Sequence, residues 1–167
     1  MSKLLLIDSD KCQGCRTCEM VCSAQHERVI NPFQSRIKVI KWDRDGEGFP
    51  TVCAHCEDAQ CLEICPVTAI KRDETPNRVI IDYDRCIGCR MCVAACHFGM
   101  AHFDTINRSV IKCDLCEGEP YCAKFCPYEA VQYTDEGELE AGKRRGSAEK
   151  LLNLMRQVLS ANGTPRA

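Results

Sequence analysis

The amino-acid sequence predicts a small α+β fold that is organised around bound metal rather than around a large aromatic core. The chain has 16 cysteines among 167 residues, but only 6% of its residues are aromatic. So high a cysteine content makes thiol chemistry the main constraint on the fold. Short aliphatic runs precede cysteine groups, and polar turns separate them, which is typical of short strands. The length favours one domain or two small ones.

The cysteines form four groups of four, and none is left over: Cys12, Cys15, Cys18, Cys22; Cys53, Cys56, Cys61, Cys65; Cys86, Cys89, Cys92, Cys96; and Cys113, Cys116, Cys122, Cys126. The first and third tetrads read C-x2-C-x2-C-x3-C, and the other two are similar and end in proline. In bacterial ferredoxins such a run gives three ligands to one [4Fe-4S] cluster and its fourth cysteine to another. We therefore expect four [4Fe-4S] clusters as cofactors.

Zinc and disulfides are the alternative uses of so many thiols. A zinc site usually takes two C-x2-C pairs set well apart, and structural disulfides need an oxidising compartment. Residues 1–8 have too short an apolar run for a signal peptide and no small-residue cleavage site. No run reaches the roughly 18 apolar residues of a membrane helix. We therefore expect a cytoplasmic protein without a membrane span.

The chain contains an internal repeat. Residues 7–18 recur as residues 81–92, and the second tetrad matches the fourth apart from a one-residue insertion. Gly14 and Gly88 occupy the same place inside a C-x2-C pair, where the backbone approaches a cluster and positive φ is expected. The order along the chain is thus A, B, A′, B′.

Local patterns predict the elements that carry the tetrads. We expect strands over residues 4–7, 36–42 and 79–82, a turn over residues 43–48, and a hairpin in which residues 100–103 and 109–112 flank Asn107. A stretch able to form a short helix follows each tetrad. These elements are short, as expected where metal ligands rather than long helices organise the core.

Nothing in the sequence indicates catalysis by this chain. Its four histidines lack an accompanying carboxylate or serine constellation, and His55 lies between Cys53 and Cys56, where a hydrogen bond near the cluster is the natural role. No glycine-rich phosphate loop or dinucleotide fingerprint is present. We expect a non-catalytic protein with no nucleic-acid partner.

On these motifs, residues 1 to about 133 resemble the four-cluster iron-sulfur electron-transfer subunits of molybdenum and tungsten enzymes. The family includes subunits of dimethyl sulfoxide reductase, formate dehydrogenase and hydrogenase complexes. The resemblance implies that the first tetrad pairs with the fourth and the second with the third. The implied ligand sets are Cys12, Cys15, Cys18, Cys126 (site 1); Cys22, Cys113, Cys116, Cys122 (site 2); Cys65, Cys86, Cys89, Cys92 (site 3); and Cys53, Cys56, Cys61, Cys96 (site 4).

The same resemblance implies the domain organisation. Each pair of tetrads forms a two-cluster module like a bacterial ferredoxin, and one module is inserted in the other. The outer module is expected over residues 1–30 and 104–142, the inner module over 50–103, and a hairpin insertion over 31–49. A helical tail occupies residues 143–167.

The tail has the pattern of an amphipathic helix that starts at Ser147 and runs to Ala161. Its apolar positions follow helical spacing: Ala148, Leu151, Leu152, Met155, Val158 and Leu159. An isolated helix of this length is marginal in water, so its apolar face needs a surface. Docking on another subunit, packing on its own subunit and binding to a membrane surface all stay open. If the surface belongs to another copy, an oligomer or an open filament results.

The expected function is the relay of single electrons through the clusters to or from the catalytic subunit of an oxidoreductase. The short chain, the missing export signal and the single tail helix resemble the small ferredoxin subunits of tungsten aldehyde oxidoreductases, so a tungstopterin or molybdopterin enzyme is the expected partner. The alternatives are an electron-transfer subunit of a formate dehydrogenase or hydrogenase, a free polyferredoxin, and an accessory protein of cluster assembly.

Overall fold

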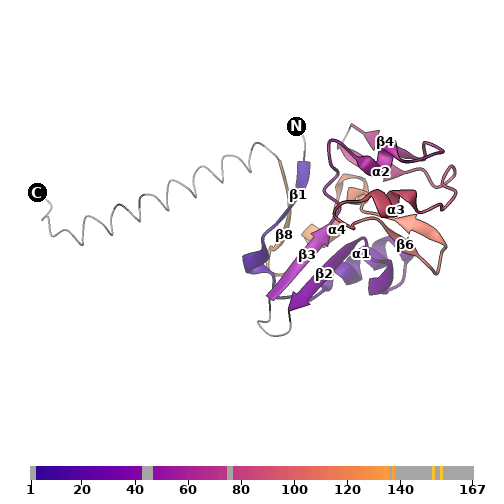
Figure 1. Ribbon diagram of the computed structural model, residues 1–167. Helices are drawn as coiled ribbons and strands as arrows, with labels where there is room; N and C mark the ends of the chain where they lie inside the picture. Colours follow the sequence, from indigo (N-terminus) through magenta and orange to yellow (C-terminus); the bar gives the residue numbers. More distant parts are fainter. Residues whose placement is uncertain are drawn as a thin grey trace, which may run out of the picture.

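The computed structural model describes residues 3–42, 47–74 and 77–135, and beyond them Gly137, Leu152 and Met155. In this part of the chain the fold is α+β, as predicted, with short helices and two-stranded antiparallel sheets (Figure 1). The strands are β1 Lys3–Ile7, β2 Ile37–Trp42, β3 Glu47–Val52, β4 Ile70–Asp73, β5 Arg78–Ile81, β6 His102–Asp104, β7 Ser109–Ile111 and β8 Val131–Asp135. The α-helices are α1 Thr17–Glu27, α2 Gln60–Glu63, α3 Met91–Ala95 and α4 Tyr121–Lys124, and 3-10 turns lie at η1 Ser9–Lys11, η2 Pro32–Gln34 and η3 Leu115–Gly118.

The first sheet joins the two ends of the cysteine-rich region. Strand β1 pairs with β8, so that Lys3 faces Asp135 and Ile7 faces Val131. The aliphatic run of β1 explains this pairing, because Ile7 packs against a core that contains the fully buried Val131. The chain thus closes on itself before the first tetrad and after the fourth.

Two of the other sheets are hairpins between tetrads. Strand β4 pairs with β5 after the second tetrad, and β6 pairs with β7 before the fourth. The predicted strand over residues 79–82 and the predicted hairpin around Asn107 are confirmed within one or two residues. Both hairpins bury a valine, Val79 in β5 and Val110 in β7, at 1% exposure.

The β2–β3 hairpin begins at the predicted strand. Ile37 pairs with Val52 at its open end, and Trp42 pairs with Glu47 at its turn. The predicted turn over residues 43–48 was too long at its end, because Glu47 and Gly48 belong to β3. Residues 43–46 lie outside the described residues. The hairpin also continues to Val52, past the expected boundary at residue 49.

Buried residues form two cores. One unites α1, β2, α4 and β8 through Cys18, Cys22, Ile37, Val39, Cys122 and Val131. The other core lies in the part of the chain between β3 and α4 and contains Ala59, Ile70, Val79, Cys92, Ala101 and Val110. In Figure 1, α1 and the β2–β3 hairpin lie below α2, α3 and β4. The first core therefore joins thiols of the first and fourth tetrads, and the second core joins thiols of the second and third.

The helices begin inside the tetrads rather than after them, which corrects the expected position. Helix α1 starts at Thr17 and carries Cys18 and Cys22 on one face, because residues four apart are neighbours on a helix. Helix α3 likewise carries Cys92, and α4 carries Cys122. The helices thus fix the directions of the thiols.

The backbone repeats as the sequence does. Gly14 and Gly88 have φ of 64° and 67°, which confirms the expected positive φ at both glycines. Equivalent non-glycine positions share this conformation, which is uncommon for side-chain-bearing residues: Arg16 and Arg90, His55 and Leu115, Thr68 and Glu129. The two halves therefore share the left-handed conformation at these positions, but Cys116 and Glu117 have positive φ that Cys56 and Glu57 lack.

Most of the predicted tail helix lies outside the described residues. Leu152 and Met155 are helical, and their exposed fractions are 47% and 54%. Ala148, Leu151, Val158 and Leu159 belong to the part that is not described. Among the described residues, no helix has the length and apolar character needed to cross a bilayer.

Candidate metal centres

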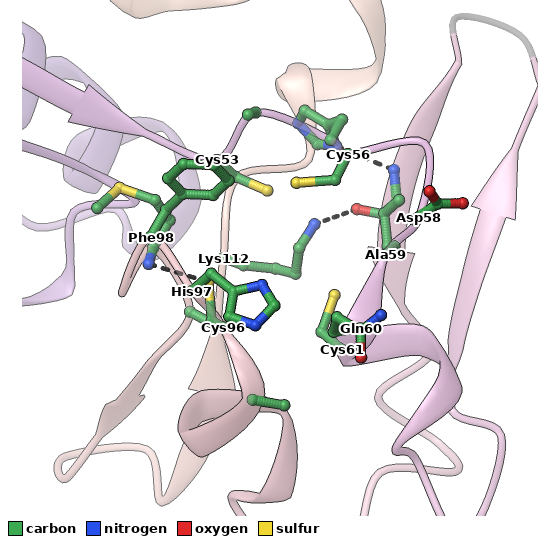
Figure 2. Close-up of a pocket in the computed structure, with 16 residues that line it drawn as sticks. Cys53, Cys56, Asp58, Ala59, Gln60, Cys61, Cys96, His97, Phe98 and Lys112 are labelled. Atoms are coloured by element: carbon green, nitrogen blue, oxygen red, sulfur yellow. Dashed lines mark hydrogen bonds between the residues drawn. The ribbon is translucent and has the colours of Figure 1, made fainter.

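Four cysteines from two tetrads border one cavity between α2 and α3. They are Cys53, Cys56 and Cys61 of the second tetrad and Cys96 of the third. In Figure 2 the thiols of Cys53, Cys56 and Cys61 point into a common space, which Cys96 borders. We refer to this space as the Cys53 cavity.

A second cavity is lined by the complementary set. Cys86, Cys89 and Cys92 of the third tetrad border it together with Cys65 of the second. Ile87 and Met91 lie in the same wall and are among the exposed large apolar residues. This Cys65 cavity therefore lies close to the protein surface.

The first and fourth tetrads meet in the other core. Helices α1 and α4 pack together there and bury Cys18, Cys22 and Cys122, with Cys12 and Cys126 packed against them. Burial is the main cause of the raised pKa of Cys122, and the nearby thiols of Cys22, Cys116 and Cys18 raise it further. Burial also raises the pKa of Cys18 to about 12, with Glu19, Cys15 and Cys12 adding to the effect. These thiols thus lie close to one another across the two tetrads.

The thiols are suited to metal rather than to disulfides. All 16 are unpaired in the structure. Burial raises the pKa of Cys113 well above 9.0 and that of Cys116 to about 11, so these two thiols stay protonated at neutral pH when no metal is bound. Because thiolates are the metal ligands, cluster binding must displace these protons.

Backbone N–H groups point at several of the sulfurs. Ala69 N lies 3.2 Å from Cys65 Sγ, Met100 N 3.3 Å from Cys96 Sγ, and Arg36 N 3.3 Å from Cys22 Sγ. For Cys65 and Cys96, burial raises the pKa, but several N–H groups of the following turn together lower it more. Such donors stabilise anionic sulfur, which is the state of a thiolate on an iron-sulfur cluster.

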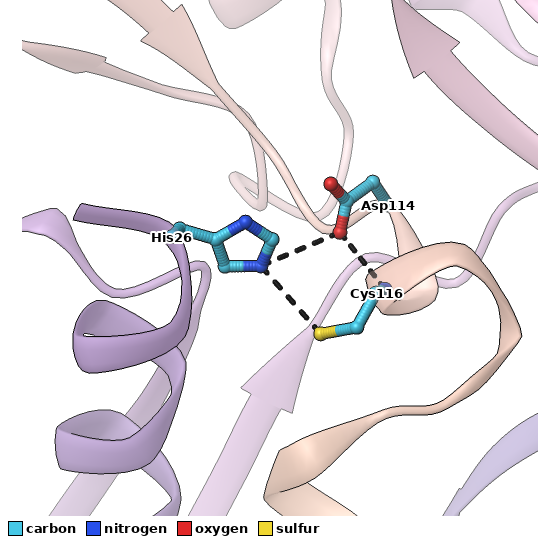
Figure 3. Close-up of side chains that lie close together, drawn as sticks. All are labelled: His26, Asp114 and Cys116. Carbon is cyan, nitrogen blue, oxygen red and sulfur yellow. Dashed lines mark hydrogen bonds and ion pairs between the residues drawn. The ribbon is translucent and has the colours of Figure 1, made fainter. Parts of the chain in front are cut away.

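One contact near a sulfur was not predicted from the sequence. His26 Nε2 on α1 lies 3.5 Å from Cys116 Sγ and 3.5 Å from Asp114 Oδ1 (Figure 3). Asp114 Oδ1 also accepts a hydrogen bond from Cys116 N at 3.0 Å. The ligand atoms of these three side chains lie close enough together to hold one metal ion. Because Cys116 belongs to a tetrad, the arrangement fits better as hydrogen bonding to a cluster ligand.

The β2–β3 hairpin covers the first tetrad. A Cβ added at Gly48 of β3 would lie 2.6 Å from Gly14 Cα and 3.0 Å from Cys12 Sγ. A Cβ at Gly14 would lie 3.1 Å from the side chain of Lys41 in β2. At the equivalent Gly88 the nearest atom would be 3.6 Å away. The hairpin therefore shields the first tetrad more closely than the chain shields the third.

The small α+β fold and the grouped thiols define an iron-sulfur protein. Residues 45–136 match the model of the 4Fe-4S dicluster domain, and residues 5–28 match that of a 4Fe-4S binding domain. The chain belongs to the family of iron-sulfur electron-transfer subunits that contain these domains. The resemblance found in the sequence is thereby confirmed at the level of the family, and the cofactors are [4Fe-4S] clusters.

Three relatives illustrate the range of this family. The chain is 40% identical over 122 residues to the polyferredoxin-like subunit of an aliphatic sulfonate oxidoreductase of Pyrococcus furiosus, covering 73% of this chain and 70% of the relative. It is 37% identical over 178 residues to the electron transport protein HydN of Escherichia coli, covering 89% and 98%. It is 29% identical over 182 residues to formate hydrogenlyase subunit 2 of Escherichia coli, covering 87% and 88%.

Proposed function

We propose that this chain is a non-catalytic electron-transfer subunit that holds four [4Fe-4S] clusters and serves the catalytic subunit of an oxidoreductase. The observation that carries the proposal is that each of two cavities is bordered by four cysteines, three from one tetrad and one from the other. A [4Fe-4S] cluster takes four thiolates and, when bound, accepts and passes on one electron. Four cysteines per cavity leave no thiol of the second and third tetrads unused.

The proposal extends to the crossed ligand scheme at all four sites. The two cavities support sites 3 and 4. Site 2 is supported because, besides burial, Cys22 raises the pKa of both Cys116 and Cys122. Site 1 is supported because, besides burial, Cys12 and Cys15 raise the pKa of Cys18. Cys126 completes site 1, supported by its packing on the same core as Cys12.

The sites form a row in the order 1, 2, 4, 3. Besides burial, Cys53 of site 4 raises the pKa of Cys113 of site 2, and Cys61 of site 4 raises the pKa of Cys92 of site 3. Sites 1 and 2 meet through Cys18 and Cys122. The exposed thiols, Cys15 in site 1 and Cys89 in site 3, belong to the two ends of the row. Electrons would therefore enter at one end and leave at the other.

Nested modules are part of this proposal. The outer module would comprise residues 1–30 and 104–142, and the inner one residues 50–103, supported by the two separate cores and by the pairing of β1 with β8. Val110 of β7 packs in the inner core, which suggests that the inner module reaches a few residues beyond 103.

For the catalytic partner we propose a tungstopterin or molybdopterin enzyme such as an aldehyde oxidoreductase. Its support is the expectation from the sequence, together with the relative named as a subunit of an aliphatic sulfonate oxidoreductase. A formate dehydrogenase or hydrogenase partner is the second candidate, which the similarity to formate hydrogenlyase subunit 2 favours.

Iron analysis and anaerobic isolation test the proposal. Protein purified without oxygen should contain about 16 iron atoms per chain, four for each cluster. A value near eight would mean that half of the tetrads hold no cluster. A large pterin-containing protein should co-purify with this chain from the native cell. Recovery of the chain alone, with its full iron content, would instead indicate a free polyferredoxin.

A further inference from the structure

The histidine between Cys53 and Cys56 is held in a defined orientation. His55 Nδ1 accepts a hydrogen bond from the backbone N–H of Val79 in β5 at 2.9 Å. An imidazole nitrogen that accepts such a bond carries no proton, so the proton of the neutral ring is on Nε2.

The other ring nitrogen lacks a protein partner. His55 Nε2 is buried, and no hydrogen-bonding group of the described residues reaches it. Leaving a buried donor unsatisfied destabilises the folded state. The ring itself lines the Cys53 cavity, where four thiolates and a cluster would supply acceptors.

A second donor borders the same cavity. Lys112 is buried, and its ammonium donates to the carbonyl oxygens of Val79 and Cys113. Figure 2 shows this side chain extending among the cysteines of the cavity. The backbone of Val79 thus holds both side chains, because its N–H donates to His55 and its carbonyl oxygen accepts from Lys112.

The internal repeat provides a comparison within the chain. The position equivalent to His55 in the fourth tetrad is Leu115, which has the same left-handed backbone and is 2% exposed. This position can therefore be filled by an apolar residue, and the fold alone does not require a histidine there. What distinguishes His55 is its free Nε2–H beside the cavity.

We propose that His55 is a positioning residue that donates an Nε2–H hydrogen bond to a sulfur of the cluster in site 4 and raises the potential of that cluster. The inference rests on the proposed ligand set of Cys53, Cys56, Cys61 and Cys96. Reduction adds negative charge to the cluster, and a donor to its sulfur stabilises the reduced state. The buried charge of Lys112 acts in the same direction.

Two substitutions of His55 separate its two hydrogen bonds. His55→Asn keeps an acceptor near the place of Nδ1 and tolerates φ of 49°, but it removes the distant donor. Its site 4 midpoint potential should shift to a more negative value, while the other three stay unchanged. His55→Gln, which can return an N–H near the place of Nε2, should recover part of the shift.

His102→Asn is the matched control. His102 Nε2 is also buried and lacks a partner among the described residues, but His102 does not line the Cys53 cavity, so its replacement should leave the site 4 potential unchanged. Potentials are read from redox titration followed by electron paramagnetic resonance, with the site 4 signal assigned as the one that Cys61→Ser alters. Four intact clusters with unchanged potentials in His55→Asn would overturn the inference and leave the proposed function standing.

A measurement on the unaltered protein covers the case in which His55→Asn loses its cluster. With 15N-labelled histidine, the reduced site 4 cluster should show weak hyperfine coupling to one imidazole nitrogen, and this coupling should be absent from His55→Gln and His55→Asn. The absence of coupling in the unaltered protein would overturn the inference, as would the strong coupling of a nitrogen bound directly to iron. Fewer than four clusters in the unaltered protein would instead count against the proposed function.

Discussion

Gln34 and Asp104 form a buried hydrogen bond between segments that lie 70 residues apart in the sequence. Gln34 Nε2 in η2 donates to Asp104 Oδ2 at the end of β6 over 2.9 Å, and the two residues are 6% and 4% exposed. The other carboxylate oxygen accepts from Ile106 N at 2.8 Å. Gln34 precedes the hairpin that packs on the first core, whereas β6 adjoins the second core. The bond therefore ties the two cores together.

Replacing Gln34 should weaken this connection. Gln34→Ala leaves a buried carboxylate oxygen without its donor, at a cost of about 1.5–3 kcal/mol for a bond to a charged group. The guanidinium concentration at which cluster absorbance is lost, measured without oxygen, should fall accordingly. Gln132→Ala is the control, because its side-chain amide donates only to the exposed carbonyl of Glu129. Equal midpoints for the two variants would show that the Gln34 bond contributes little.

The crossed ligand scheme predicts which substitutions act on the same site. Cys96→Ser should alter the signal that Cys61→Ser alters, although Cys96 belongs to another tetrad, and Cys65→Ser should alter the signal of Cys89→Ser. The reason is that Cys96 borders the cavity of the second tetrad and Cys65 borders that of the third. Electron paramagnetic resonance of each reduced variant provides the measurement.

The opposite pairing has a distinct outcome. If Cys96→Ser and Cys89→Ser disturbed one common signal, each tetrad would close on its own cluster. Cys22→Ala, Cys116→Ala and Cys18→Ala extend the test to the first and fourth tetrads. The first two should disturb the same signal and the third a different one.

Contact between Gly48 and the first tetrad predicts a local defect. Gly48→Ala would place a methyl group 2.6 Å from Gly14 Cα and 2.7 Å from Gly14 N, and backbone atoms yield less readily than a flexible side chain. Overpacking of this kind costs about 1–3 kcal/mol. The variant should lose the site 1 cluster first on mild oxidation, seen as a fall from about 16 to about 12 iron atoms per chain.

A glycine in open space serves as the control for this substitution. A Cβ at Gly137 would meet nothing within 4 Å, so Gly137→Ala should keep all its iron. Loss of a different cluster from Gly48→Ala, or of none, would show that the hairpin does not protect site 1.

Local features of this protein could be predicted from its sequence, but contacts between distant segments could not. The ligand spacing, the strand over residues 79–82 and the hairpin around Asn107 depend on neighbouring residues. The contact of His26 with Cys116 spans 90 residues, and neither residue type indicates the other. The close approach of Gly48 to Gly14 could not be predicted either, because the two glycines belong to different segments of the chain. The predicted starts of the helices were wrong because the helices contain ligand cysteines, and cysteine is a poor helix former.

The last prediction concerns the tail, which we propose to be an assembly element that no cluster requires. Leu152 and Met155 are helical and about half exposed. The sequence predicts that they share an apolar face with Leu151, Val158 and Leu159. Burying such side chains on another subunit would stabilise a complex by about 1.5–3 kcal/mol for each one fully buried.

Truncation after Gly146 should therefore keep the iron content and the cluster absorption but reduce the mass of the native assembly, measured by light scattering without oxygen. Truncation after Asn162, which spares the whole apolar face, should leave the mass unchanged. If removal of the face left the mass unaltered, the helix would pack only on its own subunit, and loss of iron would place it in the cluster-binding core. Growth of the full-length assembly with concentration, without a limiting size, would distinguish an open filament from a closed complex, since only a closed symmetry limits the number of copies.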